Sequence, residues 1–349
     1  MDAPTLAELG WRHAFRQQLD ASSTETAVPA RVLGVERSGL LVATEAGEME
    51  IPASVTGESD QATVGDWLLV DMERRRATRL LARQSLFKRR APGTDRREQL
   101  IAANVDTVFV VSSCNQDFSE ARLERYLALA NEAKVMPVVV LTKADECDDP
   151  GRYSAAAARL APGLLAEAVN ALDRASLACL EPWLGVGQTV ALLGSSGVGK
   201  STIANTLRGD GAIATRAVRA DDDKGRHTTT ARHMYRLPTG AWLVDSPGMR
   251  EIQLVDVAGG IDDVFAEISA LSGHCRFADC AHGSEPGCAV RAAVDAGDVA
   301  AERVARWRKL VREDAMNRES IAERRARGQA QGRLYKHIIG ESQARKGRK

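Results

Sequence analysis

The sequence has few aromatic residues and no long apolar run. Only 4% of its 349 residues are Phe, Trp or Tyr, so a wide stacking surface for single-stranded nucleic acid is not expected. No stretch approaches the roughly 18 apolar residues that predict a membrane-spanning helix. The first 20 residues mix acids and bases without an apolar centre, unlike a secretory signal. We therefore expect a cytoplasmic protein that does not enter a membrane.

The sequence also lacks net charge, since 47 Lys and Arg residues balance 47 Asp and Glu residues. The charge is unevenly placed, because residues 301–349 contain 15 basic and 6 acidic side chains. A basic segment of this kind indicates a polyanionic partner such as RNA. There are six cysteines, and in a reducing cytoplasm they favour metal binding over disulfides.

One stretch, Gly194–Ser201 (GSSGVGKS), fits the phosphate-loop pattern. The apolar run Thr189–Leu193 predicts a buried strand before it, and a helix follows over Ser201–Leu207. The loop glycines allow backbone N–H groups to point at a phosphate, and the helix N-terminus favours the same anion. Lys200 would reach the outer phosphates and assist catalysis, and Ser201 would bind magnesium. The residues expected to bind the nucleotide here are Gly194, Ser195, Ser196, Gly197, Val198, Gly199, Lys200, Ser201 and Thr202.

A second motif, Thr142–Asp145 (TKAD), matches the guanine-specificity loop of GTPases, with Thr142 where Asn is usual. The Asp145 carboxylate can accept hydrogen bonds from N1–H and the amine of guanine, and adenine offers no such pair. The Lys143 stem can cover the base, and the Thr142 hydroxyl can tie this loop to the phosphate loop. By itself the tetrapeptide is also compatible with an exposed turn.

Asn170 and Ala171 resemble the second guanine loop, with Asn replacing the usual Ser. Both guanine loops precede Gly194, whereas in ordinary GTPases the phosphate loop comes first. A sheet tolerates a change in where its chain begins if the original ends were close together. The order of motifs therefore predicts a circularly permuted GTPase.

The two nucleotide-sensing loops follow in the expected order. A polar loop at 225–230 offers Thr229 to the magnesium shell when a γ-phosphate is present. The sequence DSPG begins at Asp245, which would hold magnesium through water, and ends at Gly248, whose amide would contact the γ-phosphate.

Met249 stands where many GTPases place a water-orienting Gln. Methionine cannot orient water, so we expect slow intrinsic hydrolysis and a catalytic group from elsewhere. His227 is the candidate within this chain. A solvent-exposed loop histidine and a group supplied by a partner are the alternatives.

A cluster of metal-ligand residue types follows the GTPase motifs. Cys275, Cys280, His282 and Cys288 lie within fourteen positions. Three thiols and one imidazole fit a closed tetrahedral structural zinc site. The amphipathic segment Val299–Val311 is expected to pack against it.

Five short β-type runs lie between residues 28 and 86 and predict a small barrel of the oligonucleotide-binding type, although an SH3-like barrel would give a similar pattern. The runs Asp106–Ser112 and Met136–Leu141, with a helical segment between them, predict a doubly wound parallel sheet. The expected fold is therefore multidomain: a flexible arm (1–27), an OB-fold-like β-barrel (28–90), an α/β P-loop GTPase domain that is circularly permuted (91–260), a mostly helical zinc-binding domain (261–315) and a basic tail (316–349).

Taken together, these motifs resemble the ribosome small subunit-dependent GTPase A family of bacteria. The resemblance covers roughly residues 28–315 and rests on the permuted motif order and the cysteine–histidine spacing. It implies GTP hydrolysis that is stimulated by the small ribosomal subunit, a late step in subunit maturation, binding of rRNA in the GTP state and release after hydrolysis. It also implies magnesium with GTP and one structural Zn²⁺, and it supports His227 as the catalytic histidine. We expect a monomer.

Two alternatives to this function remain at the level of sequence. One is an ATP-driven P-loop enzyme, which differs by not using Asp145 to read the base. The other is a nucleotide-switched RNA-binding module that acts on another RNA, such as tRNA, with little turnover.

Overall fold

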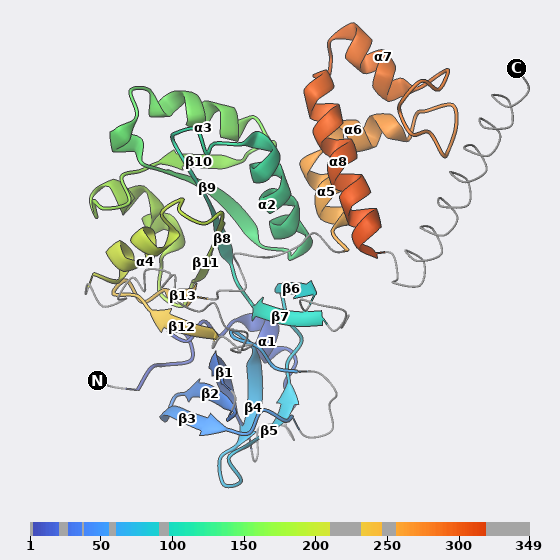
Figure 1. Ribbon diagram of the computed structural model, residues 1–349. Helices are drawn as coiled ribbons and strands as arrows, with labels where there is room; N and C mark the ends of the chain where they lie inside the picture. The colour runs from blue at the N-terminus through green and yellow to red at the C-terminus, as the bar shows by residue number, and fades with distance from the viewer. Residues whose placement is uncertain are drawn as a thin grey trace, which may run out of the picture.

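The computed structural model describes residues 3–20, 27–36, 38–55, 61–90, 98–209, 232–245 and 256–318. Figure 1 shows a barrel-like β unit, an α/β unit and a helical unit, in chain order. Across these ranges, no helix is both long and apolar enough to cross a membrane. The multidomain architecture expected from the sequence is therefore present.

The β unit is a curled antiparallel sheet with the order β5-β4-β1-β2-β3. Its strands are β1 (Ala27–Val35), β2 (Leu40–Thr44), β3 (Gly47–Ile51), β4 (Trp67–Asp71) and β5 (Arg76–Leu80). The long strand β1 pairs with both β2 and β4, and its register shifts between Val32 and Gly34. A bulge of this kind bends a strand, and here it lets one strand serve two neighbours. All five predicted strands are confirmed.

An antiparallel hairpin connects the β unit to the α/β unit and consists of β6 (Leu86–Arg90) and β7 (Glu98–Ala103). It forms a separate two-stranded sheet. The expected boundary between residues 90 and 91 falls inside this hairpin. The basic run Lys88–Arg90 at the end of β6 pairs with β7, so it belongs to the sheet and does not form a free linker.

The α/β unit contains a mostly parallel sheet of order β10-β9-β8-β11-β13-β12. Its strands are β8 (Thr107–Ser113), β9 (Met136–Thr142), β10 (Leu165–Ala168), β11 (Thr189–Gly194), β12 (Arg232–Arg236) and β13 (Trp242–Asp245). Only the β12–β13 pair within this order is antiparallel. Helices α2 (Glu120–Glu132), α3 (Pro150–Ala158) and α4 (Lys200–Arg208) accompany it. Continuous apolar strands such as β8, in which every residue is buried, are typical of a sheet covered on both faces.

Residues 3–20 are docked on the protein, with the short helix α1 (His13–Arg16) near their end. Leu9 and Phe15 are buried in the main hydrophobic core. The Trp11 ring lies edge-on to Trp67 of β4, with centroids 4.7 Å apart. This part of the chain therefore differs from the flexible arm expected for residues 1–27, because its few apolar side chains find partners on the β unit.

A polar seam joins the docked segment, the β unit and the α/β unit. Arg31 of β1 is fully buried, donates to Leu9 O, and donates from Nη2 to Thr189 Oγ1 at 2.6 Å. Burial lowers the pKa of Arg31 to about 10. Asp106 accepts from the Thr189 N–H at 2.8 Å and pairs with Arg12 at 2.7 Å. These contacts fix the β unit against the first residue of the strand that leads to the phosphate loop.

Strand pairing continues across the same junction. β1 pairs antiparallel with β12, with Gly34 opposite His233, so the two sheets form one hydrogen-bonded sheet of eleven strands. β12 begins directly after residues 210–231, which include the predicted 225–230 loop. By pairing with β12, the β unit is therefore attached to the strand that follows this loop.

The helical unit contains α5 (Ala258–Val264), α6 (Ala266–Ser272), α7 (Ala289–Ala296) and α8 (Ala301–Arg318). α5 and α6 are separated at Phe265, which is fully buried. The amphipathic segment predicted at Val299–Val311 includes the first part of α8, which begins at Ala301. In Figure 1 this unit lies against α2 of the α/β unit.

Candidate nucleotide and metal sites

The phosphate loop connects β11 to α4 and has the strand–loop–helix form that the motif requires. A Cβ at Gly194 would lie 2.3 Å from Val111 O, so only glycine allows β11 to pass so close to β8 at this point. Gly199 has φ +94° and packs against the Thr142 side chain. The glycines therefore permit both the turn and the contact with the neighbouring loop.

Lys200 is the first residue of α4 and is only 8% exposed. Its Nζ donates to Gly194 O at 2.7 Å and also to Ser195 O. The ammonium thus lies over the loop and is held by the loop's own carbonyls. Ser201 and Thr202 follow in the first turn of α4, where the helix dipole favours negative charge.

Thr142 ties the first guanine loop to the phosphate loop, as the sequence predicts. Its Oγ1 lies 2.7 Å from Val198 O and 3.1 Å from Ser112 O, and the residue is buried. Lys143 has φ +59°, which turns the chain sharply after β9. Asp145 follows in a short 3₁₀ turn, Ala144–Glu146, and is exposed.

The predicted second guanine loop is attached to the first one and to helix α4. The Ala144 N–H donates to Val169 O at 3.2 Å, and Thr206 of α4 donates to Ala171 O at 2.7 Å. The Asn170 Oδ1 accepts from the Leu172 N–H at 2.9 Å and stabilises the turn. The residues predicted to bind phosphate and guanine are therefore brought together at one edge of the sheet, where β9, β10 and β11 end. Open α/β sheets bind their ligands at this edge.

Helix α2 adds two residues that the sequence analysis did not identify. The Arg122 Nη1 donates to Ser195 Oγ at 3.0 Å, and the Tyr126 hydroxyl lies 3.3 Å from the same oxygen. Both residues come from the first half of α2. Their i, i+4 spacing marks one face of a helix, but the sequence alone does not show which loop that face contacts.

Four other predicted site residues lie at the edge of, or outside, the residues that the structure describes. His227, Thr229 and Gly248 lie outside the described residues. The backbone of Asp245 ends β13, which pairs with β11 through Ala191 and Val244. The Asp245 position is thus at the strand end beside the phosphate loop.

The predicted metal-binding residues form a cluster in the loop before α7. The ligand atoms of Cys275, Cys280, His282 and Cys288 all lie within 4.8 Å of one another. His282 Nδ1 is 3.5 Å from both Cys275 Sγ and Cys288 Sγ, and those two sulfurs are 4.0 Å apart. Ligands around a tetrahedral zinc ion are separated by about 3.5–3.8 Å, given the usual bond lengths. The donor set and its spacing therefore fit a four-coordinate structural site.

The metal-site loop is fixed from several sides. The Glu285 carboxylate accepts from the N–H groups of Ala281 and Gly283 at 3.1 and 2.7 Å. The His282 ring lies 5.2 Å from the Trp307 ring of α8, measured between centroids. The cluster is thus joined directly to α8, as expected for Val299–Val311.

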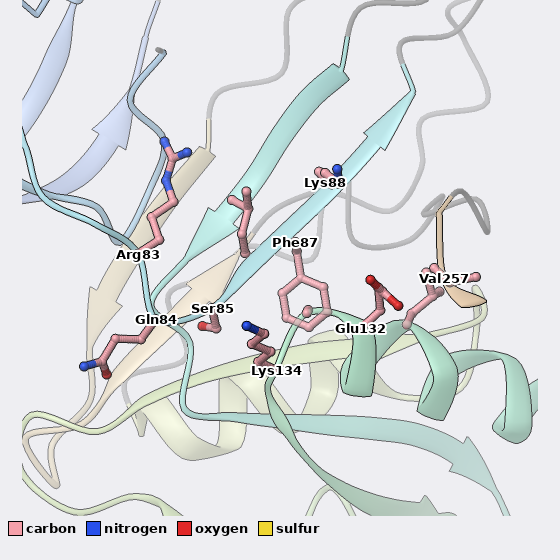
Figure 2. Close-up of a pocket in the computed structure, with 11 residues that line it drawn as sticks. Arg83, Gln84, Ser85, Phe87, Lys88, Glu132, Lys134 and Val257 are labelled. Carbon is pink, nitrogen blue, oxygen red and sulfur yellow. The ribbon is translucent and has the colours of Figure 1, made fainter. Parts of the chain in front are cut away.

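A cavity of about 310 Å³ lies away from both sites, between β6, the end of α2 and the start of α5. Figure 2 shows Lys88, Lys134 and Glu132 around it, with Val257 beside Glu132. It lies at the C-terminal end of α2, whereas Arg122 near the other end contacts the phosphate loop, about 15 Å away along the helix. The cavity is therefore not part of the nucleotide site.

Residues 80–255 match the sequence profile of the RsgA GTPase family. The chain is 48% identical to small ribosomal subunit biogenesis GTPase RsgA 2 of Vibrio parahaemolyticus, over 97% of this chain and 94% of that protein. It is 47% identical to small ribosomal subunit biogenesis GTPase RsgA of Mesorhizobium japonicum, over 90% of this chain and 91% of that protein.

Two solved structures share the fold. YjeQ from Thermotoga maritima has a TM-score of 0.58 and 22% identity, over 81% of this chain and 97% of its own. YloQ, described as a circularly permuted GTPase, has a TM-score of 0.58 and 20% identity, over 86% and 99%. The permuted motif order therefore corresponds to a known architecture.

Proposed function

The chain belongs to the RsgA GTPase family, and on that premise we propose that it hydrolyses GTP during late maturation of the small ribosomal subunit. In this proposal it binds the subunit and its rRNA in the GTP state and leaves after hydrolysis. The names of its relatives, which are small ribosomal subunit biogenesis GTPases, support the process. The observation that carries the proposal is that the first guanine loop contacts the phosphate loop, while the second contacts the first and helix α4, all at one sheet edge.

Guanine recognition in this proposal depends on Asp145, which follows the sharp turn at Lys143. The exposed carboxylate is available to accept two hydrogen bonds from the base, while Asn170 and Ala171 line the adjacent loop. Thr142 holds the base-binding loop against Val198, so base and phosphate are read by connected pieces of backbone.

The residues from Gly194 to Thr202 would bind the phosphate groups. The Lys200 ammonium would then donate to phosphate oxygens in place of the loop carbonyls. Ser201, Asp245 and Thr229 would hold the magnesium ion. The Gly248 amide would contact the γ-phosphate, and this contact would be lost on hydrolysis. Magnesium supplies positive charge that neutralises the transferring phosphoryl group. His227 would then assist the attacking water, since Met249 cannot.

The cluster of Cys275, Cys280, His282 and Cys288 would hold one structural Zn²⁺, because its four ligands leave no open position for substrate. We assign RNA contact to the β unit, this helical unit and the basic tail 316–349, since RNA is a polyanion. The protein would act as a monomer in the cytoplasm, where ribosomal subunits are assembled.

GTP turnover by the purified protein, with and without small ribosomal subunits, tests the proposal, with ATP as control. We expect slow hydrolysis alone, strong stimulation by subunits and no ATP hydrolysis. Equal turnover with and without subunits would contradict the assigned partner and would favour a different RNA, such as tRNA.

A second measurement tests whether the protein binds the subunit in the GTP state and leaves it after hydrolysis. Subunit affinity should be higher with a non-hydrolysable GTP analogue than with GDP, because the nucleotide-sensing loops differ between the two states. Identical affinities would contradict release upon hydrolysis.

A further inference from the structure

Helix α2 lies between the phosphate loop and the helical unit that bears the cysteine–histidine cluster (Figure 1). One face of α2 contacts the phosphate loop through Arg122 and Tyr126, which both lie within 3.3 Å of Ser195 Oγ. All three residues are half-buried.

Another face of α2 is held by α8 through buried charges. Glu124 is fully buried and accepts from Arg303 Nη1 at 3.0 Å and from Arg306 Nε at 2.7 Å. Arg306 also pairs with Glu120 at 2.9 Å, one helical turn earlier. A buried carboxylate is costly without such partners, and two arginines from one helix restrict how α2 can shift relative to α8.

Ser195 has a second role through its backbone. Its carbonyl accepts from Lys200 Nζ, together with Gly194 O. The position of Ser195 therefore decides where the Lys200 ammonium lies before it meets a phosphate. A contact that fixes the Ser195 side chain also fixes this carbonyl, because both belong to one residue of a tight loop.

We propose that Arg122 is a positioning residue for nucleotide binding and hydrolysis, which acts through Ser195 and is itself held in place by the grip of α8 on Glu124. This inference rests on the proposed GTPase function and adds a route that does not use the nucleotide-sensing loops. A shift of the helical unit when the protein is bound to the ribosomal subunit would move α2, and α2 would move the phosphate loop.

The test compares Arg122→Ala, Ser195→Ala and the double variant by affinity for a fluorescent GDP analogue and by kcat and KM for GTP. We expect each single variant to lose about tenfold in affinity, the size of one charge-assisted hydrogen bond. The double variant should lose no more than Arg122→Ala alone, because the arginine acts through the serine. Losses that multiply, or an unchanged Arg122→Ala, would overturn the proposal.

Two further variants separate positioning from general stability. Arg122→Lys retains a donor and should recover part of the affinity, whereas Arg159→Ala, on the exposed end of α3, should match the unmodified protein. Glu124→Gln keeps the side-chain volume and should weaken GDP binding in the same direction, with a smaller effect in the Ser195→Ala background. If Glu124→Gln lowers the melting temperature but leaves GDP affinity unchanged, the link from α8 to the loop is wrong.

GDP affinity is measured without ribosomal subunits, so this result is independent of the subunit-stimulated turnover assay. Loss of subunit stimulation with a normal Arg122–Ser195 coupling would count against the assigned partner and not against the positioning role.

Discussion

At the scale of single residues, Thr142 shows how a departure from the common guanine motif is accommodated. The usual Asn is replaced, yet the Thr142 hydroxyl still reaches Val198 O at 2.7 Å. The contact is buried and joins the base-binding loop to the phosphate loop. The substitution therefore preserves the connection between loops through one short hydroxyl group.

Replacing Thr142 by Val should weaken binding of both GTP and GDP by about tenfold. The change keeps the shape but leaves the Val198 carbonyl without this partner, a loss of about 1–3 kcal/mol. Titration with fluorescent nucleotides measures it, and Thr142→Ser is the matched control because it retains a hydroxyl. Equal affinities for Thr142→Val and the unmodified protein would show that the two loops are held together by other contacts.

Replacing Asp145 by Asn should shift nucleotide preference from guanosine toward xanthosine triphosphate. The amide can donate to the 2-oxo group of xanthine, whereas it cannot accept both guanine hydrogen bonds. Turnover with each nucleotide measures the shift, with Glu146→Gln as the neighbouring control. If GTP preference persists in Asp145→Asn, guanine is not read by this carboxylate.

At the scale of elements, helix α8 holds the helical unit to the α/β unit. Arg303 donates to the Glu124 carboxylate and to the carbonyls of Leu160 and Val264, at 2.9–3.1 Å. Its side chain is 15% exposed, so these acceptors would have little water to replace it. One side chain thus connects α2, the end of α3, α5 and α8.

We expect Arg303→Ala to destabilise the protein by about 3 kcal/mol, since removing one partner from a buried ion pair leaves unsatisfied acceptors. The midpoint of urea denaturation measures the loss. Arg312→Ala is the matched control, because Arg312 is exposed on the same helix. A similar midpoint for both variants would mean that water replaces Arg303 at its acceptors.

The elements themselves were largely predictable from sequence. β8, β9 and β11 are continuous apolar runs, and the motifs at Thr142 and Gly194 mark where two of these strands end. Hairpin β6–β7 was missed because its basic first strand pairs only with a later segment. The contact of Arg122 with Ser195 could not be predicted either, because local patterns do not show which loop a helix faces.

At the scale of the whole molecule, the cysteine–histidine cluster lies in a unit whose buried side chains, such as Phe265 and Trp307, belong to the main hydrophobic core. His282 contacts Trp307 of α8, and α8 contacts α2. The docking of residues 3–20 likewise depends on the whole molecule. Leu9, Trp11 and Phe15 are too few to form a core alone, and their docking depends on Trp67 and Arg31 from the β unit.

Removal of the metal should lower the melting temperature and expose residues 256–318 to protease, because binding of a structural metal contributes directly to folding. Chelation at neutral pH followed by limited proteolysis measures this, and elemental analysis should give one zinc per chain. Cys280→Ser should show the same pattern without chelator, while Cys179→Ser should not. Protease resistance that survives full removal of zinc would contradict a structural role.

The pairing of β1 with β12 has a consequence for how the molecule can be divided. In a GTPase sheet alone, β12 would be an edge strand with unpaired N–H and C=O groups, a template for association with other chains. Here β1 covers part of that edge, opposite His233 and Arg232. A fragment that begins after the hairpin would lose this cover, and it should self-associate at concentrations at which the intact chain stays dispersed.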